Sequence, residues 1–131
     1  MDTNIVLDVL LARKPFVKVS AAVFGLIEHS KFEGLLCATT ITTVDYLLKQ
    51  AMPRPLARQA LEKLLELFEI ASVNRAVLEE ALKSKIVDFE DAVIDQAGRL
   101  AGAEIVVTRN QQDFRQADLK ILGPDELLSS F

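Results

Sequence analysis

Residues 88–114 read DFEDAVIDQAGRLAGAEIVVTRNQQDF, and this stretch decides the fold. Residues 89–102 place apolar side chains on one side of a helical repeat that ends at Gly102, which is typical of an amphipathic helix. The β-branched run Ile105–Thr108 predicts a buried strand, and a polar turn that carries Asp113 follows it. A helix that leads directly into a buried strand indicates an α/β protein.

The rest of the chain repeats this alternation. Further helices are predicted over residues 4–11, 17–30, 44–51, 56–68 and 75–84, and further strands at Leu35–Ala38, Ile70–Val73 and Lys120–Leu122. The hydroxyls of Thr39–Thr43 are predicted to cap the helix that follows them. Strands that alternate with helices form parallel sheets covered on both faces. We therefore predict a three-layer α/β/α fold with a parallel sheet of four or five strands, in one domain over residues 1–131.

Composition restricts the class of protein. Half of the 131 residues are apolar, which excludes disorder as the general state of the chain. The net charge is -4, whereas many nucleic-acid-binding proteins are basic. This charge does not exclude nucleic-acid binding, because the carboxylates of a metal-binding pocket contribute to the negative total. The start of the chain shows no basic leader, and no apolar run reaches about 18 residues. We therefore expect a cytoplasmic protein without a membrane span.

Four acidic residues stand in short polar phrases that folding would have to bring together: Asp2, Asp45, Asp91 and Asp113. Each also has a purely structural explanation. Asp2 suits a helix cap, Asp45 suits an ion pair with Lys49, Asp91 suits a solvated helix face, and Asp113 suits an ordinary turn. Convergence of the four at the carboxyl ends of the strands would instead form an oxygen-lined pocket, and Mg²⁺ and Mn²⁺ prefer such ligands.

Three segments together resemble the PIN-domain nucleases, in particular the VapC-like bacterial toxins: DTNIVLDVLLARKPF at 2–16, ATTITTVDYLL at 38–48, and residues 88–114. The resemblance covers nearly the whole chain. It implies that the metal-binding and catalytic residues are Asp2, Asp45, Asp91 and Asp113. It also implies that Thr108 and Asn110 orient carboxylates or water. We add Asp95 as a further accessory candidate, because it lies one helical turn after Asp91.

The resemblance implies an enzyme, a metal-dependent endoribonuclease that hydrolyses RNA phosphodiester bonds with Mg²⁺ or Mn²⁺. In such sites one ion activates water for in-line attack and a second stabilises the leaving oxygen. The candidate RNA contacts are the basic residues Arg13, Lys14, Lys49, Arg54, Arg58, Arg109 and Arg115. The implied partners are a small antitoxin protein, as in a toxin–antitoxin pair, and a second copy of the chain as a homodimer.

Two departures from the family pattern leave an alternative open. Asp45 stands where the family has glutamate and is one methylene shorter, which can replace a direct metal bond by one through water. The family also has an apolar strand before its first aspartate, whereas only Met1 precedes Asp2. Either the true start lies upstream of Met1, or the first strand is truncated and the α-amino group competes with metal for the pocket. The alternative is a catalytically weak or inactive PIN-like domain that acts as a binding or scaffold module.

Two other acidic α/β classes fit the residues less well. A phosphatase with an aspartate nucleophile would need a second aspartate at position 4, where the chain has Asn4. A receiver domain would need a lysine after a late strand, and the run IVVTRN at residues 105–110 has none.

Overall fold

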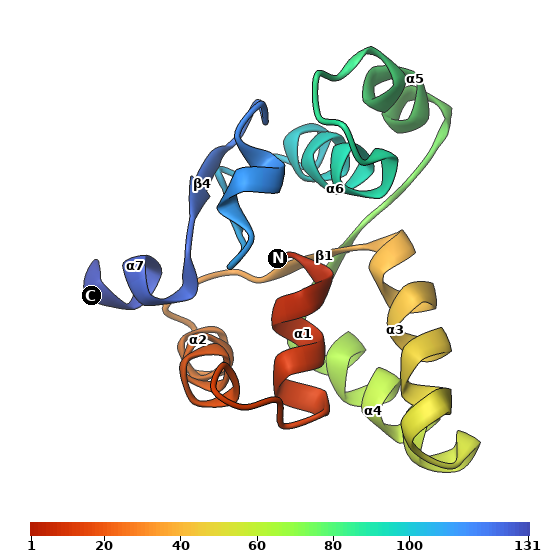
Figure 1. Cartoon of the computed structure of the whole chain (residues 1–131), viewed down its shortest axis with the longest axis vertical. Coiled ribbons are helices and arrows are strands. Elements are labelled where there is room, and N and C mark those ends of the chain that lie inside the picture. The colour runs from red at the N-terminus through yellow and green to blue at the C-terminus, as the bar shows by residue number, and fades with distance from the viewer.

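The computed structural model describes residues 1–131 and confirms the three-layer α/β arrangement (Figure 1). Four short parallel strands form the middle layer. They are β1 (Leu35–Cys37) paired with β2 (Glu69–Ala71), and β3 (Ile105–Val107) paired with β4 (Lys120–Leu122). Their positions agree with the predicted strands to within one or two residues.

Helices cover the strands on both sides, as Figure 1 shows. The upper layer in that view consists of α5 (Arg75–Lys83) and α6 (Phe89–Leu100). The lower layer consists of α1 (Thr3–Leu10), α2 (Val17–Glu28), α3 (Ala38–Ala51) and α4 (Arg54–Leu67). A 3₁₀ turn, η1 (Gln111–Phe114), follows β3, and α7 (Pro124–Ser129) packs against α2. None of the helices has the length and apolar character needed to span a membrane.

The helix ends follow local chemistry. Asn74 caps α5 by accepting the Val77 amide at 3.1 Å, and Asp88 caps α6 by accepting the Asp91 amide at 3.0 Å. Each bond satisfies an amide that has no partner within the helix. Both helices therefore begin where the sequence places a capping side chain.

The predicted cap at Thr39–Thr43 is wrong. The third helix begins at Ala38, directly after β1, and its N-cap Cys37 makes no side-chain cap bond. No turn separates strand from helix, so the threonines lie inside the helix. There Thr40 is fully buried and shares a 3.2 Å hydrogen bond with the hydroxyl of Thr3. The hydroxyl pair joins α3 to the start of α1.

Two main apolar clusters fill the layers. One contains Val6, Val44 and Leu64 and joins α1, α3 and α4. The other contains Ile94 and Val106 and joins α6 to β3. Burial at roughly 25 cal/mol per Å² of apolar surface makes these clusters the main source of stability. They hold the carboxyl ends of the strands beside the starts of α1 and α6.

The four strands form two separate pairs instead of one continuous sheet. The first two residues of the chain bridge the space between β1 and β3. The Met1 amino group donates to the Leu35 carbonyl at 3.1 Å, and the Asp2 amide donates to the Val107 carbonyl at 2.9 Å. Donation to alternate sides is the pattern of a strand inside a parallel sheet. Met1 and Asp2 therefore occupy the position of a central strand between the two strand pairs.

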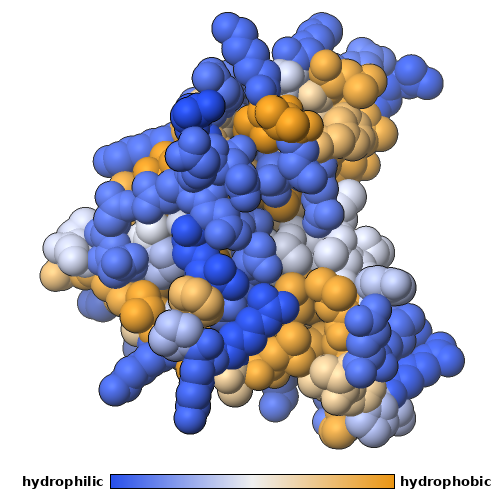
Figure 2. Space-filling view, in the orientation of Figure 1, coloured by the Kyte–Doolittle hydropathy of each residue, from blue (hydrophilic) through white to orange (hydrophobic).

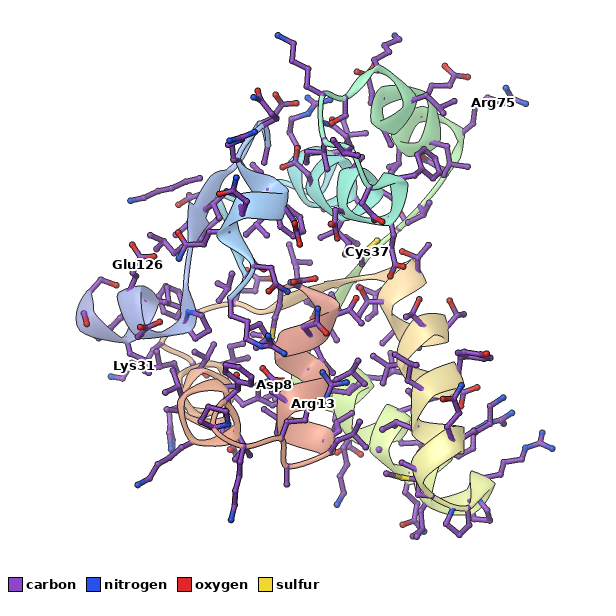
Figure 3. The ribbon with its side chains drawn as sticks, in the orientation of Figure 1. Asp8, Arg13, Lys31, Cys37, Arg75 and Glu126 are labelled. Atoms are coloured by element: carbon purple, nitrogen blue, oxygen red, sulfur yellow. The ribbon has the colours of Figure 1, made fainter.

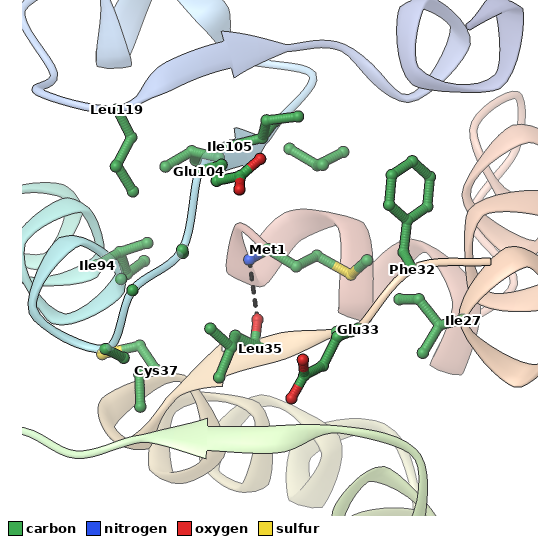
Figure 4. Close-up of a pocket in the computed structure, with 18 of the residues that line it drawn as sticks. Met1, Ile27, Phe32, Glu33, Leu35, Cys37, Ile94, Glu104, Ile105 and Leu119 are labelled. Carbon is green, nitrogen blue, oxygen red and sulfur yellow. Dashed lines mark hydrogen bonds between the residues drawn. The ribbon is translucent and has the colours of Figure 1, made fainter. Parts of the chain in front are cut away.

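A cavity of about 390 Å³ lies beside this bridge. Figure 4 shows its lining, with Met1 and Leu35 on one side and Ile105 and Leu119 on the other. The lining is mostly apolar, and it includes residues of β1 and β3. The cavity therefore lies between the two strand pairs.

Gly34 is a position where the packing requires glycine, which gives a first prediction. A Cβ atom there would lie 2.7 Å from the Phe68 ring and 2.8 Å from Ile27. Gly34→Ala is expected to lower the free energy of unfolding by about 1–3 kcal/mol, because the neighbours must shift. Denaturant unfolding measures the change.

Gly25→Ala is the matched control for this prediction. Gly25 lies in the middle of α2, and nothing lies within 4 Å of a Cβ added there. This variant is expected to be stabilised by up to about 1 kcal/mol, because alanine favours the helix. An equal loss of stability in both variants would contradict the packing explanation.

Candidate active site

Asp2 is held rigidly at the start of α1. Its side chain is only 4% exposed, and the Thr108 hydroxyl donates to its Oδ2 at 2.8 Å. Burial raises the pKa of Asp2, the Thr108 bond opposes that rise, and the charge of Asp113 adds to it. The carboxylate is thus fixed at the end of β3 and keeps one oxygen free of side-chain hydrogen bonds.

Asp91 lies in the first turn of α6 and faces several other acids. Burial, followed by the charges of Asp2, Asp88, Asp113 and Glu90, raises the pKa of Asp91 to about 7. Like charges disfavour ionisation only when they are close. Asp2, Asp91 and Asp113 therefore belong to one electrostatic cluster, although they come from three distant segments of the chain. We call these three residues the acidic cluster.

Thr108 and Asn110 support the cluster through the turn after β3. The Asn110 amide donates to the Thr108 hydroxyl oxygen at 3.0 Å, and the Asp113 amide donates to the Asn110 carbonyl at 3.0 Å. Thr108 is fully buried, whereas Asp113 is exposed. The turn thus links the buried Asp2 to the exposed Asp113 by a continuous series of hydrogen bonds.

Asp45 differs from the acidic cluster in its partners. Its Oδ2 lies 3.0 Å from Lys49 Nζ in an ion pair along α3. Its Oδ1 is buried and has no hydrogen-bond partner. Leaving a buried carboxylate oxygen without a partner costs free energy, so a water, an ion or a substrate group would be stabilised there.

The chemical type of the predicted ligands suits a hard divalent cation. The four predicted ligands are all carboxylates, which suits Mg²⁺ or Mn²⁺ better than zinc. No three acidic, histidine or cysteine side chains, however, lie close enough together to enclose one ion. Mg²⁺ usually keeps several waters and takes only one or two protein carboxylates. The arrangement therefore suits an ion bound partly through water.

Asp95 is occupied by the loop after η1. Its fully buried carboxylate accepts the Asp118 amide at 2.9 Å and the Leu119 amide at 3.2 Å. Burial raises its pKa, and these two backbone bonds oppose the rise. Asp95 thus stabilises that loop through its two backbone hydrogen bonds. Its accessory role in the chemistry remains a prediction.

Five of the basic residues predicted to contact RNA divide into two groups. Arg13, Lys49 and Arg109 each lie in an ion pair with an aspartate. Lys14 and Arg115 are exposed and make no ion pair within the chain. The second group therefore has charges that remain available to a phosphate backbone.

Glu90 carries no signal as a site residue in the sequence, and Asp8 stands out there only as an extra acid near the candidate ligands. Glu90 accepts a hydrogen bond from the Thr43 hydroxyl at 3.2 Å and so joins α6 to α3. Asp8 is fully buried and pairs with Arg109, with Arg109 Nε 2.9 Å from Asp8 Oδ2. An aspartate in the apolar first helix is itself a sequence signal for a buried ion pair, because a charged side chain is rarely buried without a partner.

The fold and site define an α/β protein with a cluster of carboxylates at the carboxyl ends of its strands. The family model described as "PIN domain" matches residues 1–112. The chain therefore belongs to the PIN-domain family, which confirms the resemblance found in the sequence.

Two known proteins show the same relationship. Ribonuclease VapC1 from Aquifex aeolicus (strain VF5) is 23% identical over 131 residues, which cover 96% of this chain and 90% of the relative. A crystal structure of VapBC2 from Rickettsia felis, bound to a DNA fragment from their promoter, matches with a TM-score of 0.72 at 14% identity. That match covers 93% of this chain and 95% of the other, and it shows a common fold.

Proposed function

We propose that the chain is a divalent-metal-dependent endoribonuclease that hydrolyses RNA phosphodiester bonds. The observation that carries this proposal is the acidic cluster, in which burial and mutual repulsion raise the pKa of Asp91 to about 7. A protein gains nothing in stability from such repulsion, whereas a bound cation relieves it. The family membership and a relative named as a ribonuclease support the same function.

Mg²⁺ or Mn²⁺ is the cofactor that the donors favour. Asp2, Asp91 and Asp113 would hold it, and Asp45 Oδ1, which has no hydrogen-bond partner, would be the fourth oxygen donor. When bound, the ion supplies an activated water and neutralises charge on the phosphate. The chain contributes orientation: Thr108 fixes Asp2 through its 2.8 Å bond. Because that bond occupies Oδ2, the other oxygen of Asp2 would be the one that contacts the ion.

The experiment that tests the function is RNA cleavage by the purified chain. A single-stranded RNA is incubated with Mg²⁺ or Mn²⁺, and a chelator provides the metal-free control. Metal-dependent internal cleavage is the expected result. Equal cleavage with and without the chelator would contradict metal dependence, and no cleavage in any condition would refute the nuclease.

Arg115 is proposed as an RNA contact, because it is exposed two residues after Asp113 and has no ion pair. Arg115→Gln is expected to raise KM for RNA about 3–10-fold with little change in kcat. It is also expected to reduce the slope of log KM against log salt concentration by about one. Steady-state kinetics at several salt concentrations measure both effects. Arg75→Gln is the control, since Arg75 lies on α5 and pairs with Glu79. The same KM rise in both variants would contradict the contact.

The proposed partners are a small antitoxin protein and a second copy of the chain. The matched solved structure is named as VapBC2 bound to promoter DNA, which supports a toxin–antitoxin pair. Several large apolar side chains are exposed and available for a partner, including Tyr46 and Leu65 on α3 and α4, and Leu82 and Phe89 on α5 and α6. Figure 2 shows apolar surface beside an indentation between these two helix pairs. Coexpression with the product of a neighbouring short reading frame, followed by light scattering, tests both partners.

A binding or scaffold module is the second candidate function. One observation favours it: no three potential ligands lie close enough together to enclose one ion. In that case Mn²⁺ would bind weakly, and RNA would not be cleaved at any metal concentration. Cleavage that requires the acidic cluster would rule this candidate out.

A further inference from the structure

Asp8 is a buried charge that the proposed chemistry does not use. It lies in the middle of α1 and is fully buried. Its Oδ2 accepts from Arg109 Nε at 2.9 Å and from the Ser20 hydroxyl at 3.4 Å, and its Oδ1 accepts from Arg109 Nη2 at 3.2 Å. Arg13 Nη1 lies 3.7 Å from the same Oδ1 (Figure 3). A buried carboxylate is strongly destabilising unless it is paired in this way.

Arg109 is held by two contacts that fix the plane of its guanidinium. The first is the two-point contact with Asp8, which has the fork geometry that arginine prefers. The second is the ring of Phe16, whose centroid lies 3.9 Å from Arg109 Cζ. A guanidinium that is hydrogen-bonded along its edge and stacked on an aromatic ring at its face has little rotational freedom. The side chain of Arg109 is therefore an anchor for the backbone that carries it.

That backbone is the turn that supports the acidic cluster. Arg109 lies between Thr108, which binds Asp2, and Asn110, whose amide bonds to Thr108. Asp2 and Asp8 lie at the start and in the middle of the same helix. The end of β3 is thus attached to α1 at two points, through Asp2–Thr108 and through Asp8–Arg109. Two points of attachment fix the orientation of the turn, which one point alone would leave free to rotate.

We propose that Asp8 is a positioning residue that acts through Arg109. It holds the turn Thr108–Asn110 against α1 and so keeps Asp113 in place beside Asp2. This inference rests on the proposed nuclease function for its kinetic consequence. Its structural consequence, an ordered turn, does not depend on that function.

The kinetic test compares Asp8→Asn with the intact chain. Loss of residues that orient catalytic groups typically costs 10–100-fold in activity, and we expect a fall of that size in kcat, with KM for RNA changed less than about twofold. Asp8→Glu is expected to restore more activity than Asp8→Asn, because it keeps the charge. An unchanged kcat in Asp8→Asn would overturn the proposal, as would a loss confined to KM.

A double-mutant cycle tests whether Asp8 acts through Arg109. If it does, Asp8→Asn combined with Arg109→Met is no worse in kcat than Arg109→Met alone. Losses that multiply in the double variant would contradict the coupling. Phe16→Leu provides a milder variant at a partly exposed position, 38% exposed. It is expected to lower kcat by a few-fold while the fold is kept, and a wild-type kcat there would count against the anchor.

Hydrogen exchange separates positioning from general stability and needs no RNA. The Asn110 and Asp113 amides are expected to lose protection selectively in Asp8→Asn, because their acceptors lie in the released turn. The α5 amides are the internal control. Equal loss of protection in α5 and in the turn would contradict the positioning role, because it would show that Asp8 only stabilises the fold as a whole. If the intact chain does not cleave RNA but the selective loss occurs, the nuclease proposal fails and the positioning role stands.

Discussion

Asp91→Asn is expected to abolish RNA cleavage and to stabilise the folded chain at the same time. Asparagine keeps the shape of the side chain but removes the charge that holds a cation. We expect kcat/KM to fall by about 10³-fold or more, a loss of roughly 4 kcal/mol in transition-state stabilisation. Single-turnover cleavage with Mg²⁺ or Mn²⁺ measures the fall.

The gain in stability follows from the direction of the pKa shift. The pKa of Asp91 is raised from 3.8 to about 7 in the folded chain, so the folded state binds more protons than the unfolded state between these values. The contribution of Asp91 to stability is therefore largest below pH 4 and is lost as the pH rises to about 7. Asparagine has no proton to lose. The variant is expected to gain about 1–2 kcal/mol over the intact chain at pH 8, a figure reduced for partial exposure.

Asp125→Asn is the matched control, because Asp125 is an exposed aspartate on α7. It is expected to keep full activity and to leave the pH dependence of unfolding unchanged. Chemical denaturation at pH 4 and pH 8 measures the stability. If Asp91→Asn lost activity together with stability at pH 8, the repulsion within the acidic cluster would be refuted.

Four apolar residues joined ahead of Met1 are expected to stabilise the chain and to speed cleavage. They would continue the alternate donation of Met1 to Leu35 and of Asp2 to Val107. Their side chains would fill the cavity of about 390 Å³ between β1 and β3. After the cost of ordering the added residues, we expect a gain of about 2 kcal/mol or more.

The extension is expected to speed cleavage because it converts the free α-amino group of Met1 into an amide. The Met1 amino group is buried, which lowers its pKa, and the charge of Asp2 raises that pKa. An amide at that position cannot be protonated, so it removes the charge that the amino group would carry in competition with metal for Asp2. The control is a Gly-Ser extension of equal length, which removes the same charge without apolar side chains. Equal melting temperatures for the two extended chains would contradict a strand in the cavity, and cleavage no faster than that of the unextended chain would contradict the competition.

The order of helices and strands could be predicted because it depends on local patterns. The β-branched run at Ile105–Val107 and the cap at Asn74 act within a few residues of themselves. The start of α3 could not be predicted in the same way. Its threonines suit a cap, but β1 passes directly into the helix and leaves no turn for a cap to occupy.

The site was predictable only in part, since it depends on contacts between distant segments. The sequence placed Asp2, Asp91 and Asp113 at the ends of elements, and the structure brings these three into one cluster. It could not show that Asp95 faces the Asp118–Leu119 backbone, because the one-turn spacing from Asp91 defines a helix face but not its neighbour. Nor could it show that Asp8 and Arg109, 101 residues apart, form a buried pair.

Mn²⁺ binding to the purified chain at pH 7 tests the central claim most directly. Isothermal titration in buffers of different ionisation enthalpy reports both affinity and proton release. Binding is expected to release protons, because the Asp91 carboxyl is partly protonated near its pKa of about 7. We predict that Asp91→Asn abolishes this binding and that Asp125→Asn leaves it unchanged. Binding of equal strength in the two variants would contradict a shared cation at the acidic cluster.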